Sequence, residues 1–250
     1  MLEVNKRLID LLSTHAKNST VKDVRIGLGY TAVQLDSGHA GVAWTPEESS
    51  DSCTHFGAAG TLAGSPCLHL LTLLAHETSG LARALGLATA NAILTALPRP
   101  AAIKEEAIDS LNITEADHVA MVGYFGPIIG TLKKTGCRLD VVELNPERGE
   151  DTLPPQKGKD ALASCTVAII TGTTLINGTF DEVTGLLSDP RAAVLLGPSS
   201  PLCGKVFQGT KITHLAGSRV LDAAAVLRIV SEGGGTMIMK PYLEFETVLS

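Results

Sequence analysis

The chain has 250 residues, enough for one large or two modest domains, and carries a formal charge of −6 with an isoelectric point near 5.6. Hydrophobic residues at 44% exclude general disorder, and an acidic chain with 4% aromatic residues lacks the surface that nucleic-acid binding requires. Five cysteines are too few for a disulfide framework, and neither a signal peptide nor a clean spanning helix is visible, so we expect a cytoplasmic protein without membrane insertion.

Residues 1–97 predict a small α+β domain. Apolar residues recur at helical spacing over residues 4–12, and alternation over residues 24–35 predicts a strand. The turn Asp36-Ser37-Gly38 then leads into a second strand over residues 39–45. The two strands together predict a hairpin. Residues 46–66 lack periodicity and are typical of a lid or binding loop. Two helices are expected next, over residues 67–76 and 79–97.

Residues 101–250 predict a second domain, because Pro98-Arg99-Pro100 cannot continue a helix. We expect a helix over about residues 101–111. Strands are expected over residues 119–122, 139–142, 167–170, 193–196 and 212–216, and helices around Leu132 and over residues 158–164, 180–187 and 223–232. This alternation favours a Rossmann-like parallel sheet with helices on both faces, so the predicted fold class is α/β.

A glycine-rich turn follows the first strand of this domain, from Gly123 to Gly130. A helix that begins there would offer free N–H groups to an anion, and Glu143, 20 residues later, could accept from a ribose hydroxyl. The spacing of the glycines is not that of dinucleotide-binding loops. Phe125 also places a large side chain where the backbone would have to approach a pyrophosphate. We therefore disfavour NAD and FAD and retain an S-adenosylmethionine-type ligand or a small anionic metabolite. Alternatively, the glycines only turn the chain and Glu143 is solvated.

Two later strands end in polar segments, TGTTLINGT from Thr171 and GPSSPL from Gly197. Ligands of open α/β sheets bind beyond the carboxyl ends of the strands. The ligand-binding candidates in these segments are Thr171, Thr174, Asn177 and Ser199. Alternatively, Asn177 or Thr179 caps the next helix and the serines form an ordinary turn.

Asn91 lies in an alanine-rich helical stretch, where asparagine is a poor helix former. A buried amide must find hydrogen-bond partners, and these are either a ligand or neighbouring backbone. Asn91 is therefore a further binding candidate.

Cys53-Thr54-His55 and Cys67-Leu68-His69 form a repeated C-x-H pattern. Thiolate and imidazole are suitable donors for zinc or a softer metal. However, the one-residue spacing is short, and Cys67 and His69 on a helix would point to different faces. Cys53 and His55 are weak metal candidates, and ordinary core or loop roles are favoured over a metal site for all of these residues.

The segments GYFGP, TGTTLINGT, GPSSPL and HLAGSRVLD, which begin at Gly123, Thr171, Gly197 and His214, resemble an uncharacterised family named "putative heavy-metal chelation". The first half, with its hairpin and its Ala90-Asn91-Ala92, resembles the companion domain with an enolase N-terminal-like fold. The resemblance implies a site between this domain and the Rossmann-like domain. The glycine-turn residues Gly123, Tyr124 and Phe125 would belong to that site.

The resemblance implies condensation or hydrolysis steps in the synthesis of pterins, flavins or siderophore-like chelators. Two alternatives remain: an S-adenosylmethionine-dependent methyltransferase-like enzyme, and a non-catalytic metal carrier or sensor. The expected partner is a small molecule or a metal chelate. A homo-oligomer is also conceivable, since apolar helices in the first half could pack against a second copy.

Overall fold

The computed structural model describes residues 3–47, 56–103, 105–149 and 151–250. The first part contains α1 (Glu3–Lys17), β1 (Val21–Ile26), β2 (Tyr30–Leu35), β3 (Ala40–Trp44), α2 (Cys67–Thr72) and α3 (Gly80–Ala96). The second part contains β4 (Ala102–Ile103), β5 (His118–Val122), α4 (Gly126–Thr135), β6 (Arg138–Val142), β7 (Thr152–Leu153), α5 (Pro155–Ser164), β8 (Val167–Thr171), α6 (Thr174–Asn177), α7 (Phe180–Leu186), β9 (Ala192–Leu196), β10 (His214–Val220), α8 (Ala223–Ser231), α9 (Thr236–Met239) and β11 (Leu243–Leu249).

The described strands form two sheets. β1, β2 and β3 make an antiparallel sheet, and the larger sheet has eight strands in the order β4-β11-β10-β9-β8-β5-β6-β7. The strands from β10 to β7 are parallel, whereas β11, near one edge, pairs antiparallel with both β10 and β4. The predicted fold class is confirmed: a mostly parallel α/β sheet accompanies a smaller α+β part.

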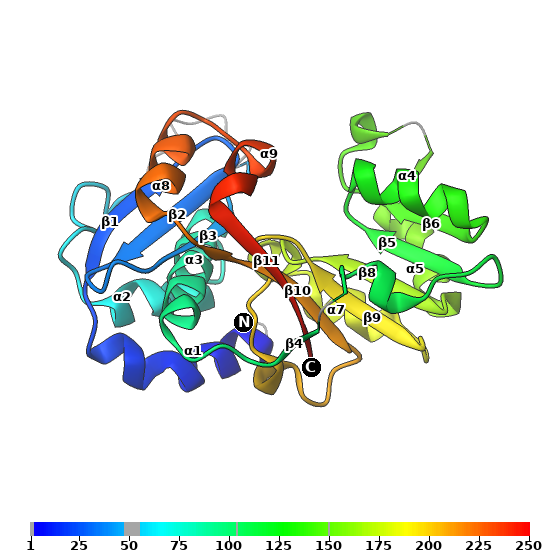
Figure 1. Cartoon of the computed structure of the whole chain (residues 1–250), viewed down its shortest axis with the longest axis horizontal. Coiled ribbons are helices and arrows are strands. Elements are labelled where there is room, and N and C mark those ends of the chain that lie inside the picture. The colour runs from blue at the N-terminus through cyan, green and yellow to red at the C-terminus, as the bar shows by residue number, and fades with distance from the viewer. Residues whose placement is uncertain (1–2, 48–55, 104, 150) are drawn as a thin grey trace.

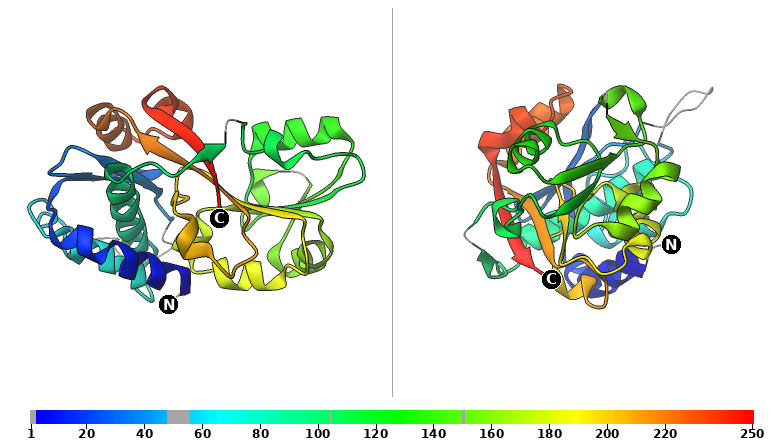
Figure 2. Two further views of the ribbon diagram at one scale, coloured as in Figure 1. Left: turned by 60° about the horizontal axis from the view of Figure 1, so that its bottom comes forward. Right: turned by 90° about the vertical axis from the view of Figure 1, so that its right-hand side faces the viewer.

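Successive residues of each central strand point to opposite faces of the large sheet, and both faces are buried. On β8, Val167 and Ile169 pack in a cluster with Ile129 and Leu132 of α4. The intervening residues of β8 pack on the other face, in the cluster that includes Phe180 of α7. Figure 2 shows α4 and α7 on opposite sides of the sheet. Strands buried on both faces read as apolar runs, which is why they could be recognised from the sequence.

The small sheet lies between α3 on one face and α8 on the other (Figure 1). A Cβ at Gly41 on β3 would lie 2.2 Å from Ala92 N and 2.4 Å from Ala88 O, so glycine and alanine allow backbone-to-backbone packing of β3 on α3. On the opposite face, Val226 and Val230 of α8 pack against the sheet. The second part of the chain thus returns to cover the first.

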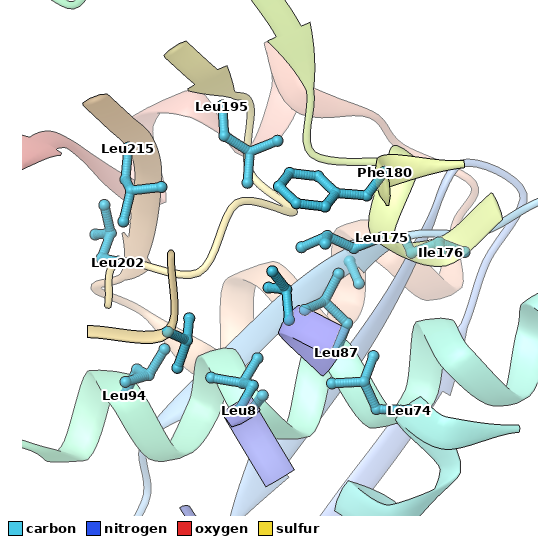
Figure 3. Close-up of a cluster of buried hydrophobic side chains, with 14 of the residues drawn as sticks. Leu8, Leu74, Leu87, Leu94, Leu175, Ile176, Phe180, Leu195, Leu202 and Leu215 are labelled. Atoms are coloured by element: carbon cyan, nitrogen blue, oxygen red, sulfur yellow. The ribbon is translucent and has the colours of Figure 1, made fainter. Parts of the chain in front are cut away.

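One continuous hydrophobic core joins the two parts (Figure 3). Leu8 of α1 and Leu87 of α3 belong to the same buried cluster as Leu175, Phe180 and Leu195. Asn5, 1% exposed, donates from Nδ2 to the carbonyls of both Leu74 and Leu175. These contacts hold the two sheets in a defined relative position. The domain boundary at residues 98–100 stays a prediction.

Two predicted elements of the chain are wrong. Residues 24–35 do not form one strand, because the chain reverses between β1 and β2 and the Gly27 N–H donates to Tyr30 O at 2.8 Å. A Cβ at Gly27 would lie 2.0 Å from Val230 O, so glycine also permits the approach of α8 there. The helix expected over residues 101–111 is replaced by β4, which pairs with β11, and a short 3₁₀ turn (Asp109–Leu111).

Candidate functional site

A cleft of about 620 Å³ lies between the small sheet and the carboxyl end of the large sheet. β5 and β8 are neighbours in the sheet, yet the chain leaves β5 toward β6 on one side and reaches β9 from β8 on the other. Such a reversal of strand order is where open α/β sheets bind ligands. Eight of the nine residues predicted to bind an organic ligand line this cleft: Gly123, Tyr124, Phe125, Glu143, Thr171, Thr174, Asn177 and Ser199.

The glycine turn forms one wall of the cleft. Gly123 has φ of +95°, a conformation that favours glycine, and helix α4 begins three residues later with a proline in its first turn, as predicted. The Phe125 ring lies over this turn: a Cβ at Gly123 would be 3.6 Å from Phe125 Cε2, and one at Gly197 would be 3.9 Å from Phe125 Cε1. The backbone is therefore covered by an aromatic ring, which leaves little room for a pyrophosphate.

The segment after β8 brings hydroxyl and amide groups to the cleft. Thr171 Oγ1 lies 3.1 Å from Thr173 Oγ1, and Thr174 donates its hydroxyl to Thr171 O at 2.8 Å. Asn177 lies within α6, and neither its side chain nor that of Thr179 caps α7. The capping alternative is therefore wrong for Asn177, whereas Thr179 does occupy the N-cap position of α7 without a side-chain hydrogen bond to the helix.

The segment after β9 contacts the small sheet. Ser199, 2% exposed, accepts the Trp44 N–H at its Oγ at 2.8 Å. This segment also packs tightly on the neighbouring one, because a Cβ at Gly172 would lie 2.6 Å from Ser200 Oγ and 2.8 Å from Ser200 N. Ser199 therefore joins two parts of the chain rather than forming an ordinary turn alone.

Aromatic residues of the small sheet complete the cleft. Tyr30 begins β2 and Trp44 ends β3, and the two are partners in the sheet register. Tyr30 Oη lies 2.7 Å from Thr236 Oγ1 of α9, which also lines the cleft. Burial raises the pKa of the Tyr30 phenol, and the hydrogen bond with Thr236 acts in the opposite direction. Tyr30 is therefore a neutral phenol at physiological pH.

The loop after β6 supplies charged groups. Glu143 accepts the N–H groups of Leu144 and Asn145 at its Oε1, at 2.8 and 3.1 Å. Glu143 is thus not simply solvated, because one carboxylate oxygen holds its own loop. Arg148 of this loop and Lys159 of α5 also line the cleft.

Asn91 does not line the cleft. It is 6% exposed, and its Nδ2 donates to Val42 O at 2.9 Å, across the contact between α3 and β3. Of the two partners expected for a buried amide at this position, the structure provides neighbouring backbone.

No described residues form a group of three or more His, Cys, Asp or Glu that could hold a metal ion. Cys53 and His55 lie outside the described residues. Cys67 is buried while His69 is exposed, so the two do point to different faces of α2. Burial raises the pKa of the Cys67 thiol to about 11, so it is not a thiolate at neutral pH. The described residues therefore do not fit a protein-held metal.

Several cleft residues were not predicted from the sequence. These are Tyr30, Trp44, Glu47, Arg148, Lys159, Glu182 and Thr236. Tyr30 and Trp44 could have been found as aromatic residues at the start of one hairpin strand and the end of the next, which antiparallel pairing brings together. Arg148 and Lys159 carry no local signal, because single basic residues in a loop and on a helix surface are common.

Two protein-family models match this chain, one in each of its two parts. Residues 106–249 match the DUF364 family, and residues 9–94 match the DUF4213 family; both are described as "Putative heavy-metal chelation". The chain belongs to the DUF364 family. The resemblance predicted from the four segments is confirmed.

The DUF364 chain is also similar to individual proteins along its whole length. An uncharacterized protein of Methanocaldococcus jannaschii is 27% identical over 247 residues, which cover 95% of this chain and 93% of that one. A DUF364-family structure of unknown function from Pyrococcus horikoshii superposes with a TM-score of 0.86 at 22% identity, over 99% of this chain and 100% of that one. A second, from Desulfitobacterium hafniense, gives 0.84 at 19% identity, over 100% and 99%. These structures share the fold.

None of the helices in the described parts of this DUF364 chain combines the length and apolarity needed to cross a membrane.

Proposed function

We propose that the cleft binds a small heteroaromatic compound of the pterin, flavin or siderophore-like chelator class, on which the protein carries out a condensation or hydrolysis step. The observation that carries this proposal is the meeting of aromatic side chains from the small sheet and the glycine turn with hydroxyl and amide groups from the segments after β8 and β9. Mostly apolar clefts of this size with a few convergent polar groups are typical small-molecule sites.

The aromatic walls favour a flat ring system. Tyr30 and Trp44 approach from the small sheet, and Tyr124 and Phe125 from the glycine turn. Offset or edge contacts between rings add about 0.5–1.5 kcal/mol per pair beyond buried area. The polar groups of Thr171 and Asn177 at the strand ends are suited to the ring nitrogens and carbonyls of such a compound.

Chemistry in the cleft would rest on a carboxylate. Glu143 stands at the end of β6 with Oε1 occupied by backbone N–H groups, and we propose that Oε2 acts as a general base toward the bound compound. Replacement of Glu143 by Gln keeps one acceptor oxygen for the loop while it removes the base. Under this proposal, Glu143→Gln binds the compound but loses turnover.

Trp44 gives a direct test of binding, because it is the chain's only tryptophan and it lines the cleft. We expect catechol-type and pterin-type compounds to change the fluorescence of Trp44 and to raise the midpoint of thermal unfolding. Isothermal titration calorimetry should then show binding of the same compounds. Absence of binding by pterins, flavins and chelator precursors, all at millimolar concentration, would contradict the proposal.

The methyltransferase alternative makes a different prediction for the same cleft. Under it, S-adenosylhomocysteine binds in isothermal titration and Phe125→Ala does not improve affinity. The Phe125 ring over Gly123 and Gly197 argues against this alternative, because the ring covers the backbone that the cofactor would approach. Failure of S-adenosylhomocysteine to bind would exclude it.

The metal-carrier alternative rests on the family description and on the C-x-H pattern of Cys53 and His55. Elemental analysis of protein purified without a tag tests it. Stoichiometric metal that disappears in both Cys53→Ser and His55→Ala would favour a carrier over the proposed binding of an organic compound.

A further inference from the structure

Two cationic side chains on one flank of the cleft have no ion-pair partner among the described residues. Arg148 follows β6 and Lys159 lies on α5; both line the cleft, and neither forms an ion pair or a side-chain hydrogen bond with the residues described. By contrast, Arg99, Arg191 and Arg219 are each paired with a carboxylate. Unpaired cations gathered in a cleft of a protein with net charge −6 call for an explanation.

The backbone of Arg148 is held in place by hydrogen bonds within its own loop. Glu143 Oε1 accepts two backbone N–H groups, Asn145 Oδ1 accepts the Glu147 N–H at 3.0 Å, and the Arg148 N–H donates to Asn145 O at 3.2 Å. The Tyr124 ring packs beside this loop, because a Cβ at Gly149 would lie 2.5 Å from Tyr124 Cε2. The Tyr124 ring therefore packs against the residue that follows Arg148.

Lys159 is brought to the same flank by close helix packing. A Cβ at Gly158 would lie 2.5 Å from Val142 Cγ2, so only glycine lets α5 approach the end of β6 this closely. The next residue, Lys159, then reaches the cleft. The only carboxylate among the described cleft residues from β6, its loop and α5 is Glu143, so cations outnumber carboxylates there. The other carboxylates of the cleft come from elsewhere: Glu47 from the segment after β3 and Glu182 from α7.

We infer that Arg148 and Lys159 form a subsite for an anionic substituent, a carboxylate or a phosphate, on the aromatic ligand. This inference rests on the proposed function and specifies its substrate class: the ring lies among the aromatic walls, and its anionic group lies between the guanidinium and the ammonium. Arginine suits such a group because its planar fork donates two parallel hydrogen bonds, and lysine adds a point charge.

Matched pairs of compounds test the inference by isothermal titration of the full chain. FMN and riboflavin differ in a phosphate, and pterin-6-carboxylate and pterin differ in a carboxylate, so the pairs also distinguish the two anions. We expect the anionic member of at least one pair to bind about tenfold more tightly, and this preference to shrink as salt is raised from about 0.05 to 0.5 M.

The test variant is Arg148→Gln/Lys159→Gln, and the control is Lys17→Gln/Lys22→Gln, which changes net charge equally at exposed residues outside the cleft. We expect the test variant to lose the tenfold preference while it keeps its affinity for the neutral compound, and the control to retain the preference. Equal binding of both members of each pair, or a preference that survives in the test variant, overturns the anionic subsite and leaves the proposed function standing. If no compound binds the unaltered protein, the proposed function fails, and the inference fails with it.

Discussion

Ser199 accepts the backbone N–H of Trp44 at its Oγ, at 2.8 Å, and so ties the last residue of β3 to the segment that follows β9. The two residues are 155 positions apart, and Trp44 belongs to the small sheet whereas Ser199 follows a strand of the large one. Because Ser199 is 2% exposed, water does not readily replace the hydroxyl. This contact fixes one edge of the cleft and places the only tryptophan in its wall.

We expect Ser199→Ala to destabilise the protein by about 1–3 kcal/mol, because the Trp44 N–H loses its acceptor in a buried place. Urea denaturation followed by circular dichroism measures this change. Ser188→Ala, at an exposed serine, is the control and should change the free energy of unfolding by less than about 0.5 kcal/mol. Equal effects of the two variants would show that the Ser199 hydroxyl has no special role.

Gly172→Ala should displace the segment that carries Ser199. The new Cβ would lie 2.6 Å from Ser200 Oγ and 2.8 Å from Ser200 N, and the backbone atom cannot move without shifting its segment. We expect a loss of about 1–3 kcal/mol and a change in Trp44 fluorescence.

Gly185→Ala is the matched control for Gly172→Ala. Gly185 lies on exposed helical surface of α7 with nothing within 4 Å of an added Cβ. It should stabilise the protein by up to about 1 kcal/mol through helix propensity. A Gly172→Ala variant as stable as this control would contradict the close packing of the two segments.

Asp117 should make stability depend on pH in the acid range. Its carboxylate accepts from Arg191 Nε and Nη2, both at 2.9 Å, and these hydrogen bonds lower its pKa below the ordinary value. The unfolded chain therefore takes up the proton first, at a pKa of about 3.9. The stabilisation is present above about pH 4 and is lost as the pH falls further toward the folded-state pKa.

Asp117→Asn should therefore be less stable than the unaltered protein at pH 6, and the difference should shrink between pH 4 and pH 2.5. Thermal or urea denaturation across this range measures the difference. Asp189→Asn, at an exposed residue, is the control and should leave the pH profile unchanged. A constant difference between Asp117→Asn and the unaltered protein at all pH values would contradict the lowered pKa.

Arg219 should stabilise the protein far more than Arg99, although both pair with Glu246. Arg219, 4% exposed, donates from Nε to Glu246 and from Nη1 to Leu94 O, both at 2.8 Å. Its replacement by Met leaves a buried carboxylate with fewer partners and should cost about 3–5 kcal/mol.

Arg99→Met is the control for Arg219→Met, because the Arg99 side chain, which pairs with Glu244 and Glu246, is 55% exposed whereas that of Arg219 is 4% exposed. It should lower the midpoint of urea unfolding only slightly. Comparable losses in the two variants would contradict the dominant role of burial.

The central strands and most helices could be predicted because their signals are local. β5, β8 and β9 are short apolar runs, and α1 and α8 show helical spacing with clear ends. The predicted helix over residues 101–111 failed because β4 exists only by pairing with β11, 144 positions later at the Ile103–Thr247 pair. The strand β11 itself alternates in LEFETVL, a signal that could have predicted it.

The candidate site was partly predictable for the same reason. Glycines and polar residues directly after β5, β8 and β9 can be read as strand ends, and parallel strands bring such ends to one edge of a sheet. The hydrogen-bond partner of Asn91 could not be predicted, because a buried amide can bind either a ligand or backbone. Only the packing of α3 on β3 places Val42 O next to its Nδ2.

By itself, the sequence determined the alternating α/β pattern, the glycine turn and the polar strand ends, since each depends on side chains within a few residues of one another. The tertiary structure alone decided that Tyr30, Trp44 and Thr236 line the same cleft as those strand ends, and that Arg148 and Lys159 line it too. Those placements follow from the shared core and from α8 returning to the small sheet, contacts between residues more than a hundred positions apart that no local pattern encodes.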